Sequence, residues 1–136
     1  MLPALAVALT LHVHATPTRS SSARCAFVIV APVVEGGRGT TCLTSVDGFP
    51  APRSVIRSRG TMTFRLARGT IRARVAVVQR FRADGAHARQ KVTGTVTGGT
   101  GRYAGARGTI SGGGSVVDRR DGLGRVSLSY VVKIRT

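Results

Sequence analysis

Residues 98–114 read GGTGRYAGARGTISGGG, and this stretch decides the fold class of the chain. It holds eight glycines in 17 positions, and each glycine inside a helix costs roughly 1 kcal/mol relative to alanine. The stretch is therefore hard to place in an α-helix. Glycine instead suits tight turns and places where a strand bends, so the stretch predicts turns and short strands.

Strict alternation in the flanking sequence predicts longer strands, because successive side chains of a strand point to opposite faces. The alternating segments are residues 61–66, 70–81, 89–97 and 125–135. Shorter β-rich segments are expected at residues 24–31, 40–46, 103–111 and 114–118. Residues 55–58 are either a further short strand or part of a connection. No segment shows the 3.6-residue period of an amphipathic helix.

About eight strands joined by short turns predict an all-β fold, an eight-stranded antiparallel β-barrel, because closure removes exposed strand edges. A sandwich of two sheets is the alternative. The chain has no Trp, and Cys25 and Cys42 are too close in sequence for the bridge of an immunoglobulin sandwich. A chain of 136 residues forms one domain.

The first 15 residues are expected to be an export signal peptide. Residues 2–11 are apolar, and Val13-His14-Ala15 fits the small-residue cleavage rule, so cleavage is expected after Ala15. Residues 16–23 then form a flexible N-terminus, and residues 24–136 form the single barrel domain. A buried N-terminal strand or helix is the alternative. No other stretch suits a transmembrane span, and we expect a secreted protein, extracellular or associated with the cell wall.

One disulfide is expected between Cys25 and Cys42, because an exported chain with an even cysteine count pairs them. Two free buried thiols are the alternative. A plain hairpin centred on Gly37 and Arg38 does not place the two cysteines opposite each other, so a bulge or an earlier turn is required. Two cysteines and His87 are too few ligands for zinc, and we expect no metal and no cofactor.

The chain is strongly basic, with 21 Lys and Arg against 5 Asp and Glu and a net charge of +16. Such a field attracts anionic polymers. The basic residues are scattered along the chain, which leaves two interpretations: a solvated outer face, or a functional surface for polyanions.

Few residues suggest catalysis. Residues 99–104 match the Gly-x-Gly-x-x-Ala spacing of dinucleotide-binding loops, but no helix follows to hold a pyrophosphate. The expected mature chain has one histidine, His87, and no Asn, which argues against a catalytic triad. A hydrolase would need a convergent acid and base that the sequence does not offer, and no catalytic residue is assigned.

Four residues are candidates for a ligand cavity. Gln79 and Gln90 fall on otherwise apolar inward faces, and a polar group there needs a partner or a wet lumen. Tyr130 lies on the apolar face of the last strand, either as core or with its hydroxyl in a cavity. Arg107 is either a clamp that bonds loop carbonyls or a cation that faces the lumen.

The segment GGTGRYAGARG, residues 98–108, resembles the GGTG–basic–aromatic–x–x–ARG signature of the dirigent proteins and the related allene oxide cyclase barrel family. Residues 68–71, residues 77–79 and the closing hydrophobic strand look like the small secreted bacterial members, so the resemblance covers roughly residues 60–135. It implies an eight-stranded barrel with a hydrophobic cavity, often trimeric. The structural glycines of the motif are Gly98, Gly99, Gly101, Gly105 and Gly108.

The resemblance also implies positional catalysis, in which the protein holds a reactive molecule in one conformation. Plant relatives steer the coupling of phenol radicals or cyclise an unstable fatty-acid epoxide. Only Arg107 carries over to a pocket by the motif. The leading hypothesis is a secreted barrel that binds a small apolar molecule in its lumen, isomerase- or cyclase-like if it is an enzyme. The alternative is an extracellular binding or structural protein that uses its basic outer face on anionic polymers.

Overall fold

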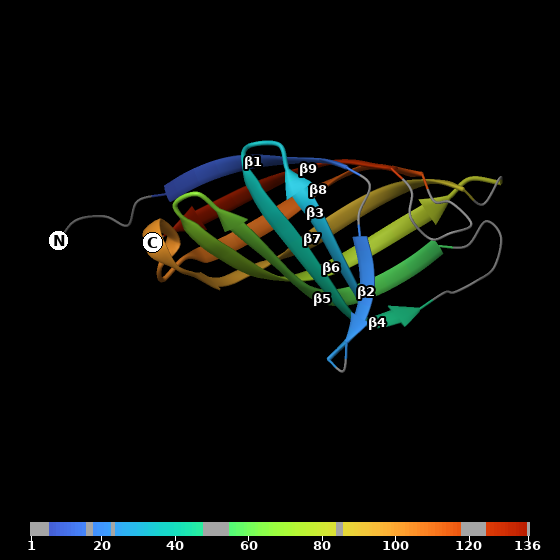
Figure 1. Ribbon diagram of the computed structural model, residues 1–136, viewed down its shortest axis with the longest axis horizontal. Helices are drawn as coiled ribbons and strands as arrows, with labels where there is room; N and C mark the ends of the chain where they lie inside the picture. The colour runs from blue at the N-terminus through green and yellow to red at the C-terminus, as the bar shows by residue number, and fades with distance from the viewer. Residues whose placement is uncertain are drawn as a thin grey trace.

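The computed structural model describes residues 6–15, 18–22, 24–47, 55–83, 86–117 and 125–135. Almost all of these residues lie in strands (Figure 1). The elements are β1 Ala6–Ala15, β2 Thr18–Ser22, β3 Cys25–Val33, β4 Gly37–Asp47, β5 Val55–Leu66, β6 Gly69–Phe81, β7 His87–Gly99, the short 3-10 helix η1 Gly101–Tyr103, β8 Arg107–Val117 and β9 Arg125–Arg135.

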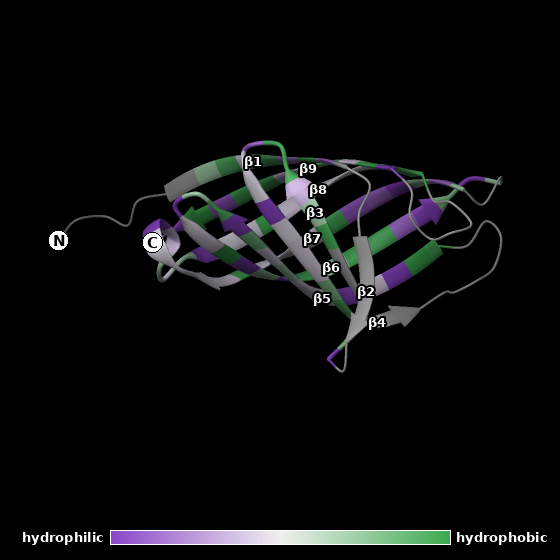
Figure 2. Ribbon diagram, in the orientation of Figure 1, coloured by the Kyte–Doolittle hydropathy of each residue, from purple (hydrophilic) through white to green (hydrophobic). Residues whose placement is uncertain are grey.

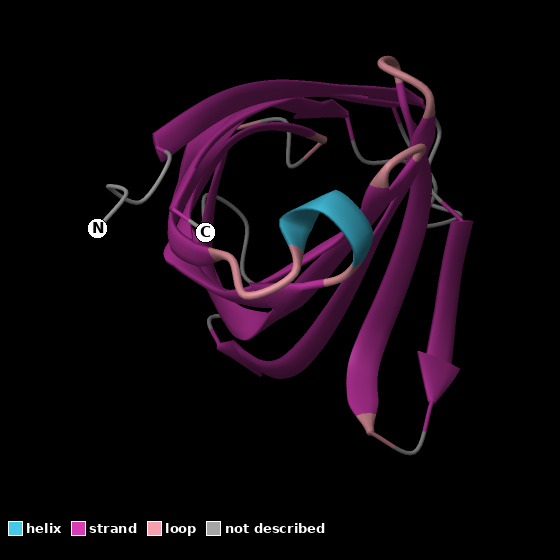
Figure 3. Cartoon of the chain, turned by 90° about the vertical axis from the view of Figure 1, so that its left-hand side faces the viewer, coloured by secondary structure: helices cyan, strands magenta, loops and turns pink. Residues whose placement is uncertain are grey.

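The strands form one antiparallel sheet in the order β1-β9-β8-β7-β6-β5-β4-β3-β2. Strand β1 and strands β3–β9 curl into a nearly closed barrel, and β2 adds to the outside edge of β3 (Figures 1 and 3). The prediction of an eight-stranded antiparallel barrel is confirmed. Within the described residues, no helix is long and apolar enough to cross a membrane.

The core is the interior of the barrel, and alternation along each strand builds it. Figure 2 shows hydrophobic and hydrophilic residues following one another along β5–β9. The largest fully buried side chains come from four neighbouring strands and are Ile71, Val92, Val96, Ile110 and Val132. The residues between them face outward and are mostly Arg, Lys, Thr and Ser.

Two predicted breaks between strands are wrong. The segments expected at 55–58 and 61–66 form the single strand β5. Strand β8 runs unbroken through Gly112, Gly113 and Gly114. Tyr103, expected at the start of a strand, lies in η1. A Cβ on Gly112 would collide with the carbonyl oxygen of Ser129 on β9. The glycines therefore let neighbouring backbones approach closely in a tightly curled sheet, and they do not end the strand.

Residues 6–15, which belong to the segment 1–15 expected as an export signal, form β1. This strand pairs with β9 over its whole length, from Ala6 opposite Arg135 to Ala15 opposite Val126. Leu11 and Val13 belong to the buried core. Residues 18–22, expected as a flexible N-terminus, pair with β3 as β2. Cleavage after Ala15 would thus remove one of the eight barrel strands.

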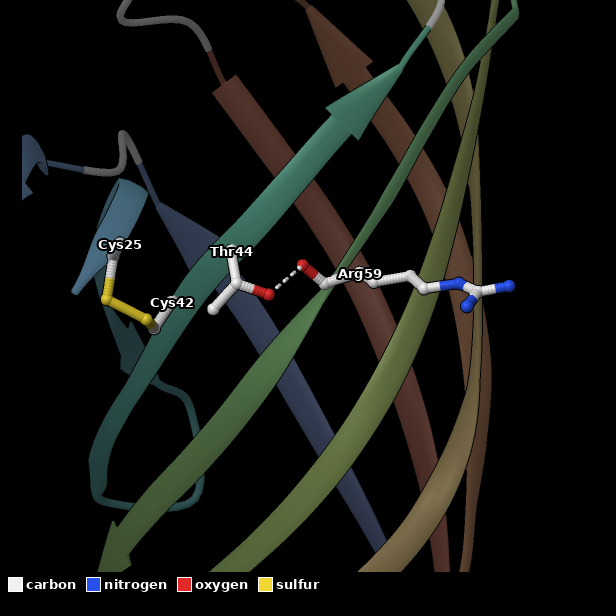
Figure 4. Close-up of a disulfide and its surroundings, with 4 residues drawn as sticks. All are labelled: Cys25, Cys42, Thr44 and Arg59. Atoms are coloured by element: carbon white, nitrogen blue, oxygen red, sulfur yellow. Dashed lines mark hydrogen bonds between the residues drawn. A yellow bond between two sulfur atoms is a disulfide. The ribbon is translucent and has the colours of Figure 1, made fainter.

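The predicted disulfide between Cys25 and Cys42 is confirmed, with 5.4 Å between the two Cα atoms (Figure 4). The hairpin between β3 and β4 turns earlier than expected, at residues 34–36, where Gly36 has a φ of +90°. This turn places Val28 opposite Cys42. Cys25 lies three positions before Val28, ahead of the first β3–β4 pair, so the disulfide joins the two strands diagonally and not at directly opposed positions.

Candidate functional site

The interior of the barrel carries a polar region among apolar walls. Strand register aligns Ser58, Val77, Val92, Gly112 and Tyr130 in one row from β5 to β9. The next row, toward the ends of β6 and β9 that lie away from η1, contains Ile56, Gln79, Gln90, Gly114 and Leu128. Three of the four candidates from the sequence thus lie on neighbouring rows of the same wall.

Gln79 and Gln90 satisfy part of each other's hydrogen-bonding capacity. They lie directly opposite on β6 and β7, and Gln79 Nε2 donates to Gln90 Oε1 at 2.8 Å. Both side chains are half-buried. The Gln79 side-chain carbonyl oxygen and the Gln90 side-chain NH2 group have no hydrogen-bond partner among the described residues. The pair therefore offers an amide donor and acceptors at the edge of the apolar interior.

Tyr130 crosses the interior. Its ring centroid lies 5.7 Å from that of Phe64 on β5, with the rings tilted by 56°. Strands β5 and β9 are separated by three strands in the sheet, so this contact bridges the lumen. Tyr130 is 3% exposed, and burial raises the pKa of its phenol above the ordinary value. The hydroxyl therefore stays protonated and able to donate.

The Tyr130 hydroxyl and the hydroxyl of Ser58, which is 5% exposed, have no hydrogen-bond partner among the described residues. Buried hydroxyls are normally paired with protein or water. Sequence reasoning did not single out Ser58, because residues 55–58 were not firmly assigned to a strand. Its alternation with Gly60 and Met62 gives the signal that would have placed it inside.

The glycine motif closes one end of the barrel, where Figure 3 shows η1 lying across the opening. Tyr103 and Ala106 are buried there. The N–H groups of Thr100 and Arg102 donate to the carbonyls of Thr70 and Arg68, at 3.0 and 2.9 Å. A side chain at Gly101, where φ is +59°, would collide with the Arg68 carbonyl oxygen. The motif thus ties the β7–β8 connection to the β5–β6 turn.

Arg107 lies outside the lumen. Ile110 of β8 is buried inside, while Arg107 and Thr109 are exposed. The Arg107 Nη1 donates to the Ala106 carbonyl at 2.8 Å, which is the contact expected of a clamp on the loop. The sequence could not show that the Arg107 side chain lies outside the barrel, because its direction depends on where β8 begins after η1.

No group of three or more His, Cys, Asp or Glu residues in the described part of the chain could hold a metal ion. The polar side chains of the two interior rows are the hydroxyls of Ser58 and Tyr130 and the amides of Gln79 and Gln90. These groups can bind and orient a molecule, with Tyr130 as a neutral donor, Gln79 and Gln90 as polar contacts, and Val77 and Leu128 as apolar wall.

Of three comparisons with known proteins, one bears on the fold. No protein-family model matches the sequence, and no curated protein matches it. A solved structure of a pterocarpan synthase dirigent protein matches with a TM-score of 0.54 and 12% sequence identity, over 97% of this chain and 90% of that chain. The chain therefore has a dirigent-like fold.

Proposed function

We propose that this dirigent-like barrel binds a small, mostly apolar molecule in its lumen and holds it in one conformation. The observation that carries the proposal is the buried Tyr130 hydroxyl, which has no partner among the described residues. A hydroxyl left unpaired in a dry core costs about 1–3 kcal/mol. A ligand oxygen, or a water that a ligand displaces, would relieve this cost.

The proposed mechanism is positional. Apolar side chains such as Val77, Val92 and Leu128 would exclude water, and Tyr130 would fix the orientation of a ligand oxygen through one hydrogen bond. Holding a reactive molecule in a near-attack geometry is sufficient to steer a reaction whose reactive species forms elsewhere. The solved dirigent neighbour is described as a pterocarpan synthase, which supports a phenolic or aromatic ligand class here.

An extracellular setting is part of the proposal. The Cys25–Cys42 disulfide fits an oxidising compartment. We propose that the protein is exported, by whatever leader the chain uses, and that the disulfide forms outside the cytosol.

The test compares 1-naphthol with naphthalene, two probes that differ by one hydroxyl. Both are titrated by fluorescence against the wild type, Tyr130→Phe and the matched control Tyr103→Phe, which removes a hydroxyl at the closed end. We expect Tyr130→Phe to weaken 1-naphthol binding about 10-fold, the value of one buried hydrogen bond. Naphthalene binding should be unchanged, and Tyr103→Phe should bind both probes as the wild type does.

Two outcomes would contradict the proposal. Failure of the wild type to bind either probe would exclude an accessible lumen site. Equal affinities of Tyr130→Phe and wild type for 1-naphthol would remove Tyr130 from the site. In that second case, a rise in the free energy of unfolding of Tyr130→Phe would identify the hydroxyl as an unpaired group in a dry core.

A further inference from the structure

The outer face of the barrel carries a groove that the lumen proposal does not use. Two open depressions lie over β4–β7, with volumes of about 720 and 570 Å³. They share Ala76 and Thr93, so they form one continuous feature, the outer groove. Its side chains come from the outward positions of the strands, and its floor comes from small residues such as Gly60, Ala76 and Gly94.

The outer groove is lined by cations and by no acidic residue. The basic residues are Arg59, Arg74, Arg80, Arg89 and Lys91. Arg89 Nη1 donates to Ser115 Oγ at 3.1 Å. The charged groups of the other four make no hydrogen bond or ion pair with a described residue. Figure 4 shows the Arg59 side chain extending away from Thr44, whose hydroxyl donates to the Arg59 carbonyl at 3.2 Å.

Like charges face each other across this groove. Arg80 on β6 lies directly opposite Arg89 on β7, and like charges at opposed positions of neighbouring strands destabilise a sheet. The described face shows nothing that compensates for this repulsion. A bound anion between the two strands would turn the repulsion into a bidentate contact, because guanidinium groups match the geometry of carboxylate and sulfate.

The cationic surface continues beyond the groove along β6. Arg72, two residues before Arg74, lies on the same face and opposite Gly98 on β7. A Cβ at Gly98 would lie 3.3 Å from Arg72 Nη2 and 3.6 Å from Arg107 Nη1. The two guanidinium groups therefore converge above a glycine that leaves room for them. An elongated anion fits this run of positive groups better than a single small ion does.

We propose that the outer groove binds an acidic polysaccharide, whose carboxylate or sulfate groups pair with the arginines. The hydroxyls of Thr61, Thr93 and Thr95 also line it and suit the hydroxyls of sugars. No aromatic residue lines it, so it lacks the stacking platform on which proteins hold single-stranded nucleic acids. The disulfide, which favours an extracellular setting, points to the same partner.

The binding test uses the whole chain and four immobilised polymers: polygalacturonate, dextran sulfate, a DNA duplex and neutral dextran. The groove variant is Arg74→Gln/Arg80→Gln. The matched control, Arg102→Gln/Arg125→Gln, removes the same charge at exposed residues outside the groove. We expect the groove variant to bind polygalacturonate at least about 10-fold more weakly, and the control about as well as the wild type. Affinity should fall as salt rises, with a shallower slope for the groove variant.

A third variant, Arg74→Lys/Arg80→Lys, keeps the charge and removes the guanidinium fork. An affinity between those of the wild type and the Gln variant supports paired recognition. Groove-dependent binding to dextran sulfate in place of polygalacturonate identifies sulfate as the anionic group. Tighter binding to the DNA duplex than to both acidic polysaccharides overturns the proposal. An equal loss of polysaccharide affinity in the groove variant and the control variant overturns it as well. The groove variant should bind 1-naphthol as the wild type does, so that a failure of the groove proposal can be told apart from a failure of the lumen proposal.

Discussion

The wall of the barrel from β5 to β9 and the seam where β1 meets β3 are closed by different forces. Along the wall, each pair of neighbouring strands is joined by a backbone ladder of ten or more paired positions. Across the seam, one backbone hydrogen bond is found among the described residues, from the Val34 N–H to the His12 carbonyl at 2.7 Å. Regular backbone hydrogen bonding between strands thus holds the wall, whereas individual side chains must hold the seam.

One carboxylate, that of Glu35, makes the polar side-chain contacts described across the seam. The His12 backbone nitrogen lies 2.9 and 3.0 Å from the two Glu35 oxygens, and His12 Nε2 lies 3.8 Å from Glu35 Oε1. His12 Nδ1 also lies 2.9 Å from Ser129 Oγ on β9. Glu35, one of five acidic residues in a very basic chain, thus takes the place of a backbone ladder at the seam.

The largest effect should come from removing β1. Deletion of residues 1–15, the product of the expected signal cleavage, removes Leu11 and Val13 from the core and exposes the edge of β9. We expect no cooperative unfolding transition in this chain, because the loss of a whole barrel strand is comparable to the 5–15 kcal/mol that stabilises a typical domain. Circular dichroism during thermal unfolding gives the measurement. Deletion of residues 1–5 is the control, since it leaves β1 intact.

A cooperative transition in the chain that begins at Thr16 would reverse this expectation. It would show that the barrel strands β3–β9 fold without β1, and it would favour the interpretation of residues 1–15 as a removable leader. The deletion therefore tests the seam and the signal-peptide prediction together.

The second-largest effect is expected from a substitution at Gly108, in the β8–β9 ladder of the wall. Its φ is +156°, and an added Cβ would collide with the Lys133 carbonyl oxygen in the β8–β9 ladder. We expect Gly108→Ala to lower the free energy of unfolding by about 3 kcal/mol, because two paired backbones must separate. Urea denaturation measures the change.

Gly105→Ala is the matched control for Gly108→Ala. Gly105 has a φ of +75° but nothing within 4 Å of an added Cβ, so the substitution carries backbone strain of about 1 kcal/mol without a collision. Equal losses in the free energy of unfolding of the two variants would mean that the wall tolerates separation of β8 and β9. The wall would then not be held by its backbone ladders more firmly than the seam is held.

Much of the wall could be predicted from the sequence, because alternation survives wherever one face of a strand is buried. The segments at 70–81 and 125–135 match β6 and β9 within a residue of each end. The cysteine pair was also predictable from composition. Residues 112–114 misled the interpretation, since three successive glycines resemble a turn when the neighbouring backbones are unknown.

The seam was harder to predict for a different reason. Leu9, Leu11 and Val13 alternate with polar residues, which is a strand signal, but the apolar composition of residues 2–11 favoured a leader. Glu35 received no role, because its partner is His12, 23 positions earlier. The outer groove likewise needs the register of β5, β6 and β7, which decides that Arg80 faces Arg89. Such pairings are properties of the closed barrel.

The smallest effect concerns Glu35 itself and gives the sharpest test of the seam. Glu35→Ala leaves the His12 N–H without its acceptor, and the side chain of Glu35 is 34% exposed, so water replaces part of the contact. We expect a loss of about 1 kcal/mol in the free energy of unfolding. Glu35→Gln, which keeps one acceptor oxygen, should lose about half as much.

Hydrogen exchange of individual amides locates the change. In Glu35→Ala, the His12 and Val34 amides should exchange faster, while the amides of Val92 and Val132 in the wall should keep their protection, because local opening of the seam leaves the ladders intact. Ser129→Ala is the control, since it removes only the contact to His12 Nδ1. Equal acceleration at the wall and the seam would show that the barrel opens as one unit, and the two regions would then differ in their bonds but not in their stability.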